Sequence, residues 1–266
     1  MPTISATLTA TAKRVVYHLP APWRQALRKR YIVYTLRSEP PPPELPLLAR
    51  LVTPGSLVID AGANVGTYTV ALAKAVPSAR ILSIEPIPTT RELLTHSVRA
   101  LGLSNVTVVP VALSDRAARV VMEIPELGGQ PMLTLARIKY SDASKPPLNT
   151  HVEVETSTLD RLLASERAPV SLLKCDVEMH ELELLRGAIG IIRRDHPAIY
   201  AELQPDFKTK ASQRAAVFAL LAAEGYAPYW FDGGTVRAGS EALDVLFLTV
   251  AHRQGLGLAE WPVSRE

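Results

Sequence analysis

The sequence predicts an α/β fold with an open, mostly parallel sheet of seven strands and helices on both faces. Short apolar runs alternate along the chain with segments whose apolar residues recur every three or four positions, the pattern of strands alternating with amphipathic helices. A glycine-containing turn joins the first run to the first such helix. At 266 residues and 47% hydrophobic content, the chain can bury a substantial core.

The first half of the chain gives three strands and two helices. Leu57–Asp60 is the first strand, and Tyr68–Val76 follows as a helix with an apolar residue at every fourth position. The second helix has proline in its first turn and glycine directly after its end, both typical helix boundary signals. These later elements are the strand Arg80–Glu85, the helix Pro88–Leu101 and the strand Val106–Leu113.

Residues 119–160 break this alternation. Short β-like pieces flank a loop that contains glycine and proline, which predicts an antiparallel insertion. The parallel pattern then resumes, because strand-like and helix-like segments alternate again. The remaining elements are the strand Val170–Asp176, the helix Glu181–Arg193, the strand Ala198–Leu203, a helix around Ser212–Glu224 and the strands Tyr226–Phe231 and Asp244–Val250.

The N-terminal segment differs in charge from the rest of the chain. Residues 1–38 hold seven Lys and Arg side chains and no acid, so a chain of net charge +3 leaves a body of −4. Such a basic arm could touch nucleic acid, an acidic membrane surface or an anionic substrate, but we favour packing on its own body or on a partner chain in a homo-oligomer. The five prolines of Glu39–Pro46 favour an extended linker. We therefore divide the chain into a helical arm with linker (1–46), a main domain (47–252) and a tail (253–266).

The single cysteine indicates the compartment. Cys175 has no partner for an internal disulfide and lies in an apolar run, as expected in a reducing cytoplasm. The chain shows neither a signal-peptide pattern nor the roughly 20 apolar residues of a membrane span. We expect a soluble cytoplasmic protein.

Polar residues end almost every predicted parallel strand. In an open parallel sheet, ligands bind at the carboxyl ends of the strands, so these side chains are expected to share one site. They are Asp60, Glu85, Ser114, Asp115, Asp176, Glu178 and Glu202.

The turn after the first strand indicates which ligand this is. Gly62 and Gly66 allow a sharp bend, but the middle glycine of a dinucleotide fingerprint is absent, and Asp60 would repel a pyrophosphate. Asp60 instead favours a cationic amino group, and Glu85 at the next strand end can accept both hydroxyls of a ribose. An adenosyl amino acid meets both demands, which predicts S-adenosylmethionine. The predicted cofactor-binding residues are Asp60, Gly62, Ala63, Asn64, Gly66, Tyr68, Glu85, Ala112, Ser114 and Asp115.

Several motifs together resemble the FkbM-type S-adenosylmethionine-dependent methyltransferases. This resemblance implies a Rossmann-like class I methyltransferase sheet and methylation of hydroxyls on small molecules such as secondary metabolites and sugars. One departure is Met179, where the family usually has glycine. The motifs are VIDAGANVGTYT (58–69), SIEPIPTTRELL (83–94), VPVALSD (109–115), STLDRLL (157–163) and LLKCDVEMHELELLRGA (172–188).

Methyl transfer to an alcohol needs a base beside the acceptor, since a neutral hydroxyl is a poor nucleophile. His180, just after the fourth strand, is the first candidate, with Asp176, Glu178 and Glu202 placed to orient it or to touch the acceptor. The same four groups could instead hold a divalent metal. We favour the metal-free arrangement and assign no metal ligands. Lys174, within the fourth strand, is expected to pair with a neighbouring carboxylate.

Three other functions remain as alternatives. A nucleic-acid methyltransferase would explain the basic arm, but the segment after the fourth strand reads DVEMH rather than the D/N-P-P-Y/F pattern of exocyclic-amine methylation. A nicotinamide-dependent oxidoreductase shares the sheet but requires the missing glycine. A scaffold without catalytic activity is the third. Acceptor specificity is assigned to the insertion 119–160 and the arm.

Overall fold

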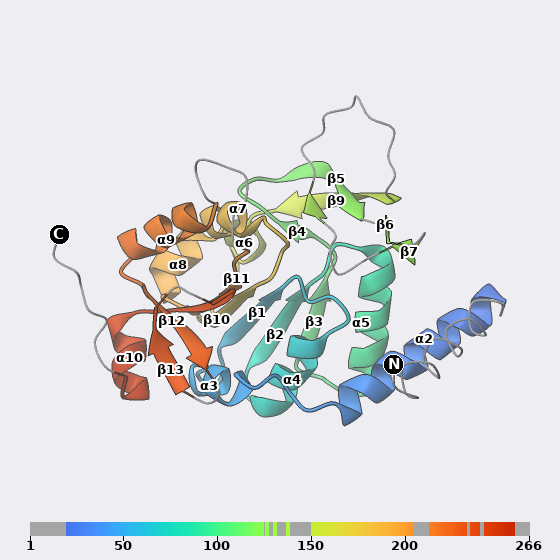
Figure 1. Cartoon of the computed structure of the whole chain (residues 1–266), viewed down its shortest axis with the longest axis horizontal. Coiled ribbons are helices and arrows are strands. Elements are labelled where there is room, and N and C mark those ends of the chain that lie inside the picture. The colour runs from blue at the N-terminus through green and yellow to red at the C-terminus, as the bar shows by residue number, and fades with distance from the viewer. Residues whose placement is uncertain are drawn as a thin grey trace, which may run out of the picture.

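The fold is organised around one eight-stranded sheet (Figure 1). The computed structural model describes residues 20–124, 126–127, 130–131, 137–138, 150–204, 213–232, 235–239 and 242–258. The strand order is β13-β12-β14-β11-β10-β1-β2-β3, and β11, β10, β1, β2 and β3 run parallel. In that order the strands span Thr235–Ala238, Ala227–Asp232, Asp244–Leu248, Ala198–Glu202, Val170–Cys175, Leu57–Ala61, Arg80–Ile84 and Val106–Val109.

This architecture confirms the predicted mostly parallel α/β class. The sheet has eight strands rather than seven, because β13 pairs antiparallel with β12 at the edge. This short strand is largely exposed, so its sequence carries no run of apolar residues that would predict it.

Helices cover both faces of the sheet, and the side chains of β1 alternate between them. Leu57, Ile59 and Ala61 pack in the core under α6, α7, α8 and α9, whereas Val58 packs in the core under α3, α4 and α10. β1 is therefore buried on both sides, as expected for a central parallel strand. These helices are α3 (Leu45–Arg50), α4 (Thr67–Ala75), α6 (Leu159–Leu162), α7 (Glu181–Arg186), α8 (Ile189–Asp195), α9 (Gln213–Ala223) and α10 (Val250–Leu256).

The predicted third strand, Val106–Leu113, is wrong as one element. The chain leaves the main sheet after Val109, since Pro110 has no N–H to continue the ladder. Ala112–Leu113 forms a separate strand, β4, in a second sheet of order β4-β9-β5-β8.

The antiparallel insertion is confirmed at its base. β5 (Ala118–Ile124) pairs with β9 (Thr150–Ser157) from Ala118↔Thr156 to Ile124↔Thr150. β8 (Arg137–Ile138) joins β5, and β6 (Glu126–Leu127) pairs with β7 (Gln130–Pro131). The rest of the insertion lies outside the described residues.

The helix predicted at Glu181–Arg193 is wrong as one element, because it is interrupted between α7 and α8. At the break, a Cβ on Gly187 would lie 2.0 Å from the carbonyl oxygen of Ser114, so only glycine fits. The Asp160 carboxylate accepts hydrogen bonds from Gly190 N and Ile191 N, both at 2.8 Å, and thereby caps α8. The interruption lets the end of α7 contact the segment around Ser114, just before the insertion.

The basic arm forms helix α2 (Ala21–Ser38), which packs along α5 (Pro88–Ala100). Lys29 Nζ lies 2.6 Å from Glu92 Oε1, and Arg37 Nη2 donates to the carbonyl of Ala100 at 3.2 Å. Among the helices that the structure describes, none combines the length and the apolar composition needed to cross a bilayer. Residues 1–19 of the arm lie outside the described part of the chain.

The expected domain borders at 46 and 252 both fall inside helices. The extended linker ends sooner than predicted, because Pro46 is accommodated in the first turn of α3, where no N–H is needed. Leu45, Leu47 and Leu48 are buried in the core of the main domain. α10 continues past residue 252, and its Leu256 packs against the same core.

Gly187→Ala should lower the free energy of unfolding by about 1–3 kcal/mol, because the new methyl group meets the backbone of Ser114. Urea unfolding followed by circular dichroism measures this change. Gly255→Ala is the matched control, since nothing lies within 4 Å of its Cβ position in α10. The control should be neutral or slightly stabilising. Equal stability of Gly187→Ala and the control would contradict the close contact.

Candidate functional site

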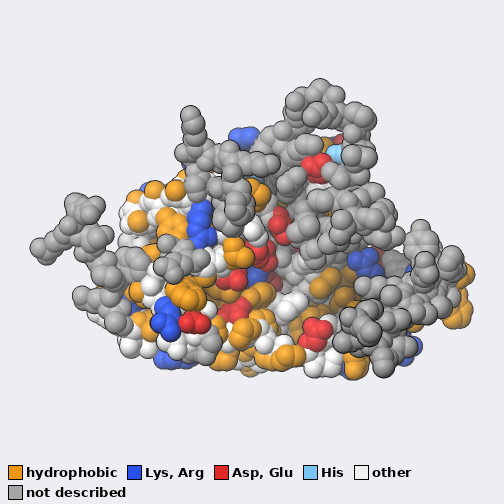
Figure 2. All heavy atoms as spheres, viewed as in Figure 1, with side chains coloured by type: hydrophobic (Ala, Val, Ile, Leu, Met, Phe, Trp, Pro, Cys, Tyr) orange, Lys and Arg blue, Asp and Glu red, His pale blue; other side chains and the backbone are white. Residues whose placement is uncertain are grey.

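A cleft of about 290 Å³ lies at the carboxyl ends of β1, β2, β10 and β11. Figure 2 shows acidic side chains gathered near the centre of the molecule, over the region of β10 and β11. Eight of the predicted site residues line the cleft, which also has an apolar wall from Val111, Leu113 and Met122. The eight are Gly62, Asn64, Glu85, Ala112, Asp176, Glu178, His180 and Glu202.

Glu85 lines the cleft and is held by backbone N–H groups. Its Oε2 accepts from Asn64 N at 3.0 Å and its Oε1 from Ile87 N at 2.8 Å. Burial raises the pKa of Glu85 to about 7. Each carboxylate oxygen has a second lone pair, so the fixed carboxylate can still accept from a ligand's hydroxyls.

The two glycines of the first turn are explained by the chain's own packing. A Cβ on Gly62 would lie 1.8 Å from the carbonyl oxygen of Asp176, so glycine lets the turn after β1 touch the turn after β10. Gly66 has φ +104° and faces Leu94, which packs with Ala63. Gly62 lines the cleft, whereas Ala63 and Gly66 are buried and are not among its lining residues.

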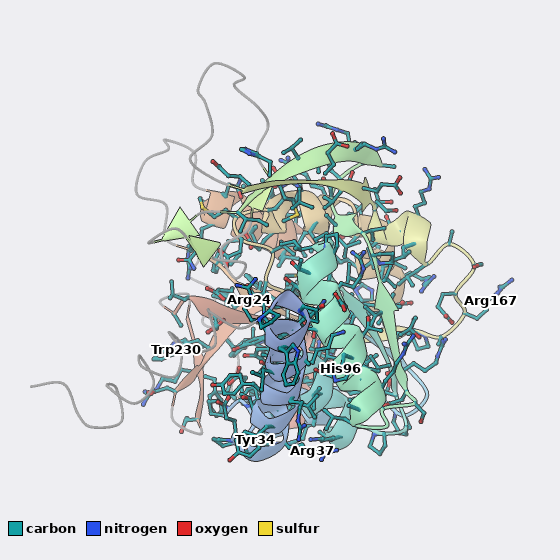
Figure 3. The ribbon with its side chains drawn as sticks, turned by 90° about the vertical axis from the view of Figure 1, so that its right-hand side faces the viewer. Arg24, Tyr34, Arg37, His96, Arg167 and Trp230 are labelled. Atoms are coloured by element: carbon teal, nitrogen blue, oxygen red, sulfur yellow. The ribbon has the colours of Figure 1, made fainter. Side chains whose placement is uncertain are left out.

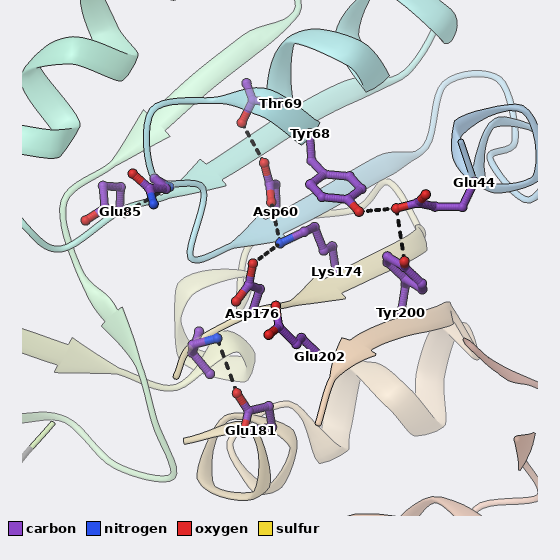
Figure 4. Close-up of polar contacts among 12 residues, drawn as sticks. Glu44, Asp60, Tyr68, Thr69, Glu85, Lys174, Asp176, Glu181, Tyr200 and Glu202 are labelled. Carbon is purple, nitrogen blue, oxygen red and sulfur yellow. Dashed lines mark hydrogen bonds and ion pairs between the residues drawn. The ribbon is translucent and has the colours of Figure 1, made fainter. Parts of the chain in front are cut away.

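Asp60 and Tyr68, both predicted to bind cofactor, are not among the lining residues either. Asp60 has no exposed surface. Its Oδ2 accepts from Thr69 Oγ1 at 2.6 Å, and its Oδ1 lies 3.8 Å from Lys174 Nζ (Figure 4). The position expected to hold a cationic ligand thus faces the protein's own ammonium group. Tyr68 stacks on that same group, with Lys174 Nζ 4.6 Å from the ring centroid.

Lys174 joins this buried cluster to the cleft. Its Nζ donates to Asp176 Oδ2 at 3.0 Å, which confirms the predicted pairing with a neighbouring carboxylate. Burial opposes the charge of this lysine, but Asp60 and Asp176 outweigh it and hold the pKa of Lys174 above its ordinary value. Lys174 thereby fixes the orientation of a lining carboxylate.

Glu44 is a member of the cluster that the sequence did not indicate. The carboxylate is buried, and its Oε1 accepts from Tyr200 Oη at 3.0 Å and from Tyr68 Oη. In the sequence, an acid within a proline-rich segment looks like part of a solvent-exposed linker. Only the fold shows that Glu44 lies against the sheet. Thr69 was missed for a similar reason, since it resembles any polar residue in a helix.

His180 lines the same cleft as Glu85 and is the residue directly before α7. Its Nε2 lies 3.0 Å from Ser114 Oγ, and its Nδ1 lies 3.5 Å from Glu183 Oε2. Burial lowers the pKa of His180, against the opposing charges of Glu183 and Asp115. The imidazole is therefore neutral near pH 7 and has one unprotonated ring nitrogen.

Ser114 and Asp115 lie near His180 and do not line the cleft. Ser114 is buried, and its Oγ lies 3.4 Å from Asp115 Oδ1. Neither residue is among those that line the cleft, so the geometry links them to the histidine. Their predicted direct contact with cofactor gains no support from this arrangement.

The turn between β10 and α7 is strained at two residues. Glu178 has φ +53° and Met179 has φ +69°, a region that favours glycine. This conformation is consistent with the glycine that the resemblance leads us to expect where this chain has Met179, whose side chain is exposed. Glu181, which the sequence analysis missed, holds the turn by accepting from Val177 N at 3.3 Å and Met179 N at 3.2 Å.

The carboxylates of Asp176, Glu178 and Glu202 make this side of the cleft acidic. Burial raises the pKa of Glu202, and the nearby charges of Asp176 and Asp244 raise it further. Gln204 Nε2 donates to Glu202 Oε1 at 2.8 Å. Within the described residues, no three His, Cys, Asp or Glu side chains are arranged to hold a metal ion.

Glu181→Gln should change the pH dependence of stability. Burial raises the pKa of Glu181 from 4.5 to about 7 in the folded state, so the folded protein keeps a proton that the unfolded chain has lost between these values. The wild-type free energy of unfolding therefore falls as pH rises from about 4.5 to about 7. Glutamine keeps the acceptor oxygen and does not titrate.

The stability difference, variant minus wild type, should accordingly increase by about 1–3 kcal/mol across that window and stay constant above it. Urea unfolding at pH 4.5, 6 and 8 measures it. Glu153→Gln, at an exposed position of β9, is the control and should give a flat difference. A flat difference for Glu181→Gln as well would show that this carboxylate is not buried as described.

Comparison with known proteins places these features in a family. The model of the methyltransferase FkbM domain matches residues 60–228. "Methyltransferase 1" of Beauveria bassiana is 28% identical over 144 residues, covering 50% of this chain and 58% of that protein. "Methyltransferase sdnD" of Sordaria araneosa is 26% identical over 195 residues, covering 64% and 73%.

A solved FkbM methyltransferase from Methylobacillus flagellatus KT shares the fold. It superposes with a TM-score of 0.51 at 14% identity, covering 88% of this chain and 57% of that one. The chain thus spans somewhat more than half the length of two of these relatives. The family model covers most of the described sheet and every residue of the cleft, so the chain belongs to the FkbM methyltransferase domain family.

Proposed function

We propose that this protein is an S-adenosylmethionine-dependent methyltransferase that transfers a methyl group to a hydroxyl of a small molecule, such as a secondary metabolite, a sugar or a modified peptide. The observation that carries the proposal is one cleft lined by both a fixed carboxylate, Glu85, and a neutral buried histidine, His180. The free buried thiol of Cys175 supports a reducing cytoplasm as its compartment.

The donor end of the cleft fits an adenosyl group. Glu85 can accept the ribose hydroxyls while Asn64 N and Ile87 N keep it in place. Val111 and Leu113 offer an apolar wall to the flat base. The acids at the other end favour the positive charges of the sulfonium and the amino group. Gly62 and Asp176 are the nearest candidates for the amino group, in place of the buried Asp60.

His180 is proposed as the base that accepts the acceptor's proton. When bound, S-adenosylmethionine supplies a methyl group that forms a C–O bond as its C–S bond breaks, with the electron pair left on sulfur. The hydroxyl proton is proposed to pass to His180 Nε2, where the acceptor hydroxyl replaces the contact with Ser114 Oγ, and Glu183 stabilises the imidazolium that results. Glu178 and Glu202 line the same cleft and are proposed to position the acceptor.

The divalent-metal arrangement stays a second version of this mechanism. It would use Asp176, Glu178, His180 and Glu202 as ligands to lower the pKa of the acceptor. We favour the metal-free version, because Asp176 is already bonded to Lys174 and His180 to Ser114. Activity that disappears with a chelator and returns with Mg²⁺ would reverse this preference.

Glu85→Ala should weaken S-adenosylmethionine binding at least tenfold, because the ribose loses its acceptor in a buried site. Isothermal titration calorimetry measures the dissociation constant. Asp232→Ala removes a half-exposed acid at the sheet edge, away from the cleft, and should leave binding unchanged. Saturable NAD binding without S-adenosylmethionine binding would instead indicate an oxidoreductase.

His180→Ala should lower turnover about 100-fold or more while the dissociation constant of the cofactor changes less than twofold. Turnover is measured as S-adenosylhomocysteine released with an acceptor found by screening hydroxylated compounds, with product mass as confirmation. Wild-type activity should fall as pH drops below a pKa that is itself under 6.5, since the base is then protonated. Unchanged turnover in the variant would remove His180 from the mechanism.

A further inference from the structure

Helix α2 presents a line of large apolar side chains to solvent. Trp23, Leu27, Tyr31 and Tyr34 are 67%, 42%, 65% and 68% exposed. At 100° per residue these positions fall within an arc of about 80° on one side of the helix, here called the aromatic stripe. The opposite side packs towards α5 through the partly buried Ile32, Val33 and Leu36. The stripe is therefore not the face that holds the arm on the protein.

Basic side chains border the aromatic stripe on both sides. Arg30 and Arg37 follow one edge and Arg28 the other, and all three are exposed. Figure 3 looks onto this side of the molecule, with Arg24, Tyr34 and Arg37 along α2 and His96 on the neighbouring α5. The described part of the arm, residues 20–38, contains five Lys and Arg residues and no acid.

The positive charge continues onto α5. A groove beside α2 is lined by Lys29, Arg91, His96 and Arg99, with Glu92 as the one acid among its lining residues. This groove lies on the α5 side of α2, away from the aromatic stripe. The stripe, the exposed arginines beside it and this groove are here called the α2–α5 face.

We infer that the α2–α5 face is a docking surface for an anionic lipid bilayer, which α2 contacts lying flat in the interface. Trp and Tyr are the residues that favour the headgroup level of a membrane, since each has an apolar ring and a polar atom. Arginine binds phosphate groups through its planar donors, and its stem can lie along apolar surface.

Other occupants match the α2–α5 face less well. A second copy of this chain, joined through the same face, would bring Arg28, Arg30 and Arg37 of each helix against those of its partner. A nucleic acid would satisfy the arginines, but it would leave Leu27 and the edges of the aromatic rings without apolar partners. Only a lipid surface complements both the charge and the apolar line.

Vesicle binding tests the inference on the full chain. A variant with Trp230→Phe and Trp261→Phe keeps Trp23 as its single tryptophan. Its emission should shift to the blue on addition of phosphatidylcholine vesicles with 30% phosphatidylglycerol, and brominated lipid should quench it. Pure phosphatidylcholine should have at least tenfold weaker effect, and 0.5 M salt should weaken the anionic binding similarly.

Two sets of substitutions separate the apolar and the electrostatic parts in a co-sedimentation assay. Trp23→Ser with Tyr31→Ser and Tyr34→Ser should reduce partitioning at least tenfold. Arg28→Gln with Arg30→Gln should also reduce it at least tenfold, at about fivefold per charge. The matched controls are Leu243→Ser with Val250→Ser, which removes other exposed apolar groups, and Arg167→Gln, an exposed arginine distant from α2 (Figure 3). Both controls should bind as the wild type does.

Three outcomes would overturn the inference. They are equal binding by the wild type and both stripe variants, tighter binding to a single-stranded RNA oligonucleotide than to anionic vesicles, and a concentration-dependent dimer that the stripe substitutions dissociate. S-adenosylmethionine binding, measured on the same variants, should stay unchanged because the stripe is remote from the cleft. Failure of vesicle binding with cofactor binding intact would therefore leave the proposed methyltransferase function standing.

Discussion

The ammonium group of Lys174 is the charge on which the site depends. It lies at the carboxyl edge of the sheet, buried between Asp60 of β1 and Asp176 beyond its own strand, under the ring of Tyr68. Several buried acids would otherwise repel one another here, because burial weakens screening by water. Its positive charge offsets part of this repulsion, and Thr69 donates to Asp60 while Tyr68 and Tyr200 donate to Glu44. The acids that face the cleft are thereby fixed in orientation.

Backbone contacts between turns set the width of the cleft. The turn after β1 touches the turn after β10 at Gly62, and the end of α7 touches the segment of Ser114 at Gly187. The first contact positions the donor end relative to Asp176, and the second positions Ser114 beside His180. Both contacts require glycine, which has no side chain, so a single added methyl group at either position would displace one wall of the site. This rigidity suits a transfer that requires its reacting atoms about 3 Å apart.

Most of the fold could be predicted from the sequence, because the parallel strands are continuous apolar runs separated by helix-like periodicity. The predicted elements are wrong where a local sequence pattern is compatible with two different structures. Residues 106–113 look like one strand until Pro110 is seen to direct the chain into a second sheet. Residues 181–193 look like one helix, although Gly187 is required by a contact with a segment some 70 residues earlier.

Site residues were predictable where an acid or a histidine follows a strand, as for Glu85, Asp176 and His180. The direction in which each side chain points could not be predicted from the sequence. Asp60 also ends its strand, but it points into the sheet edge because Lys174 needs a counter-ion there. Glu44 shows the converse, since nothing near it in sequence indicates that two tyrosines of the core bond to it.

The pairing of β5 with β9 determines how freely the insertion can change in length. Seven residue pairs close this ladder, and its outer end brings Ile124 opposite Thr150. Thr158 and Asp160, just beyond β9, cap α6 and α8, so the base of the ladder is tied to the framework of the catalytic cleft. A loop whose two ends are held together by a strand ladder can lengthen with little loss of stability. Each doubling of its length adds only about 0.6 kcal/mol to the entropy cost of closing it. The segment between residues 124 and 150 can therefore change in length or sequence while the walls of the cleft stay in place.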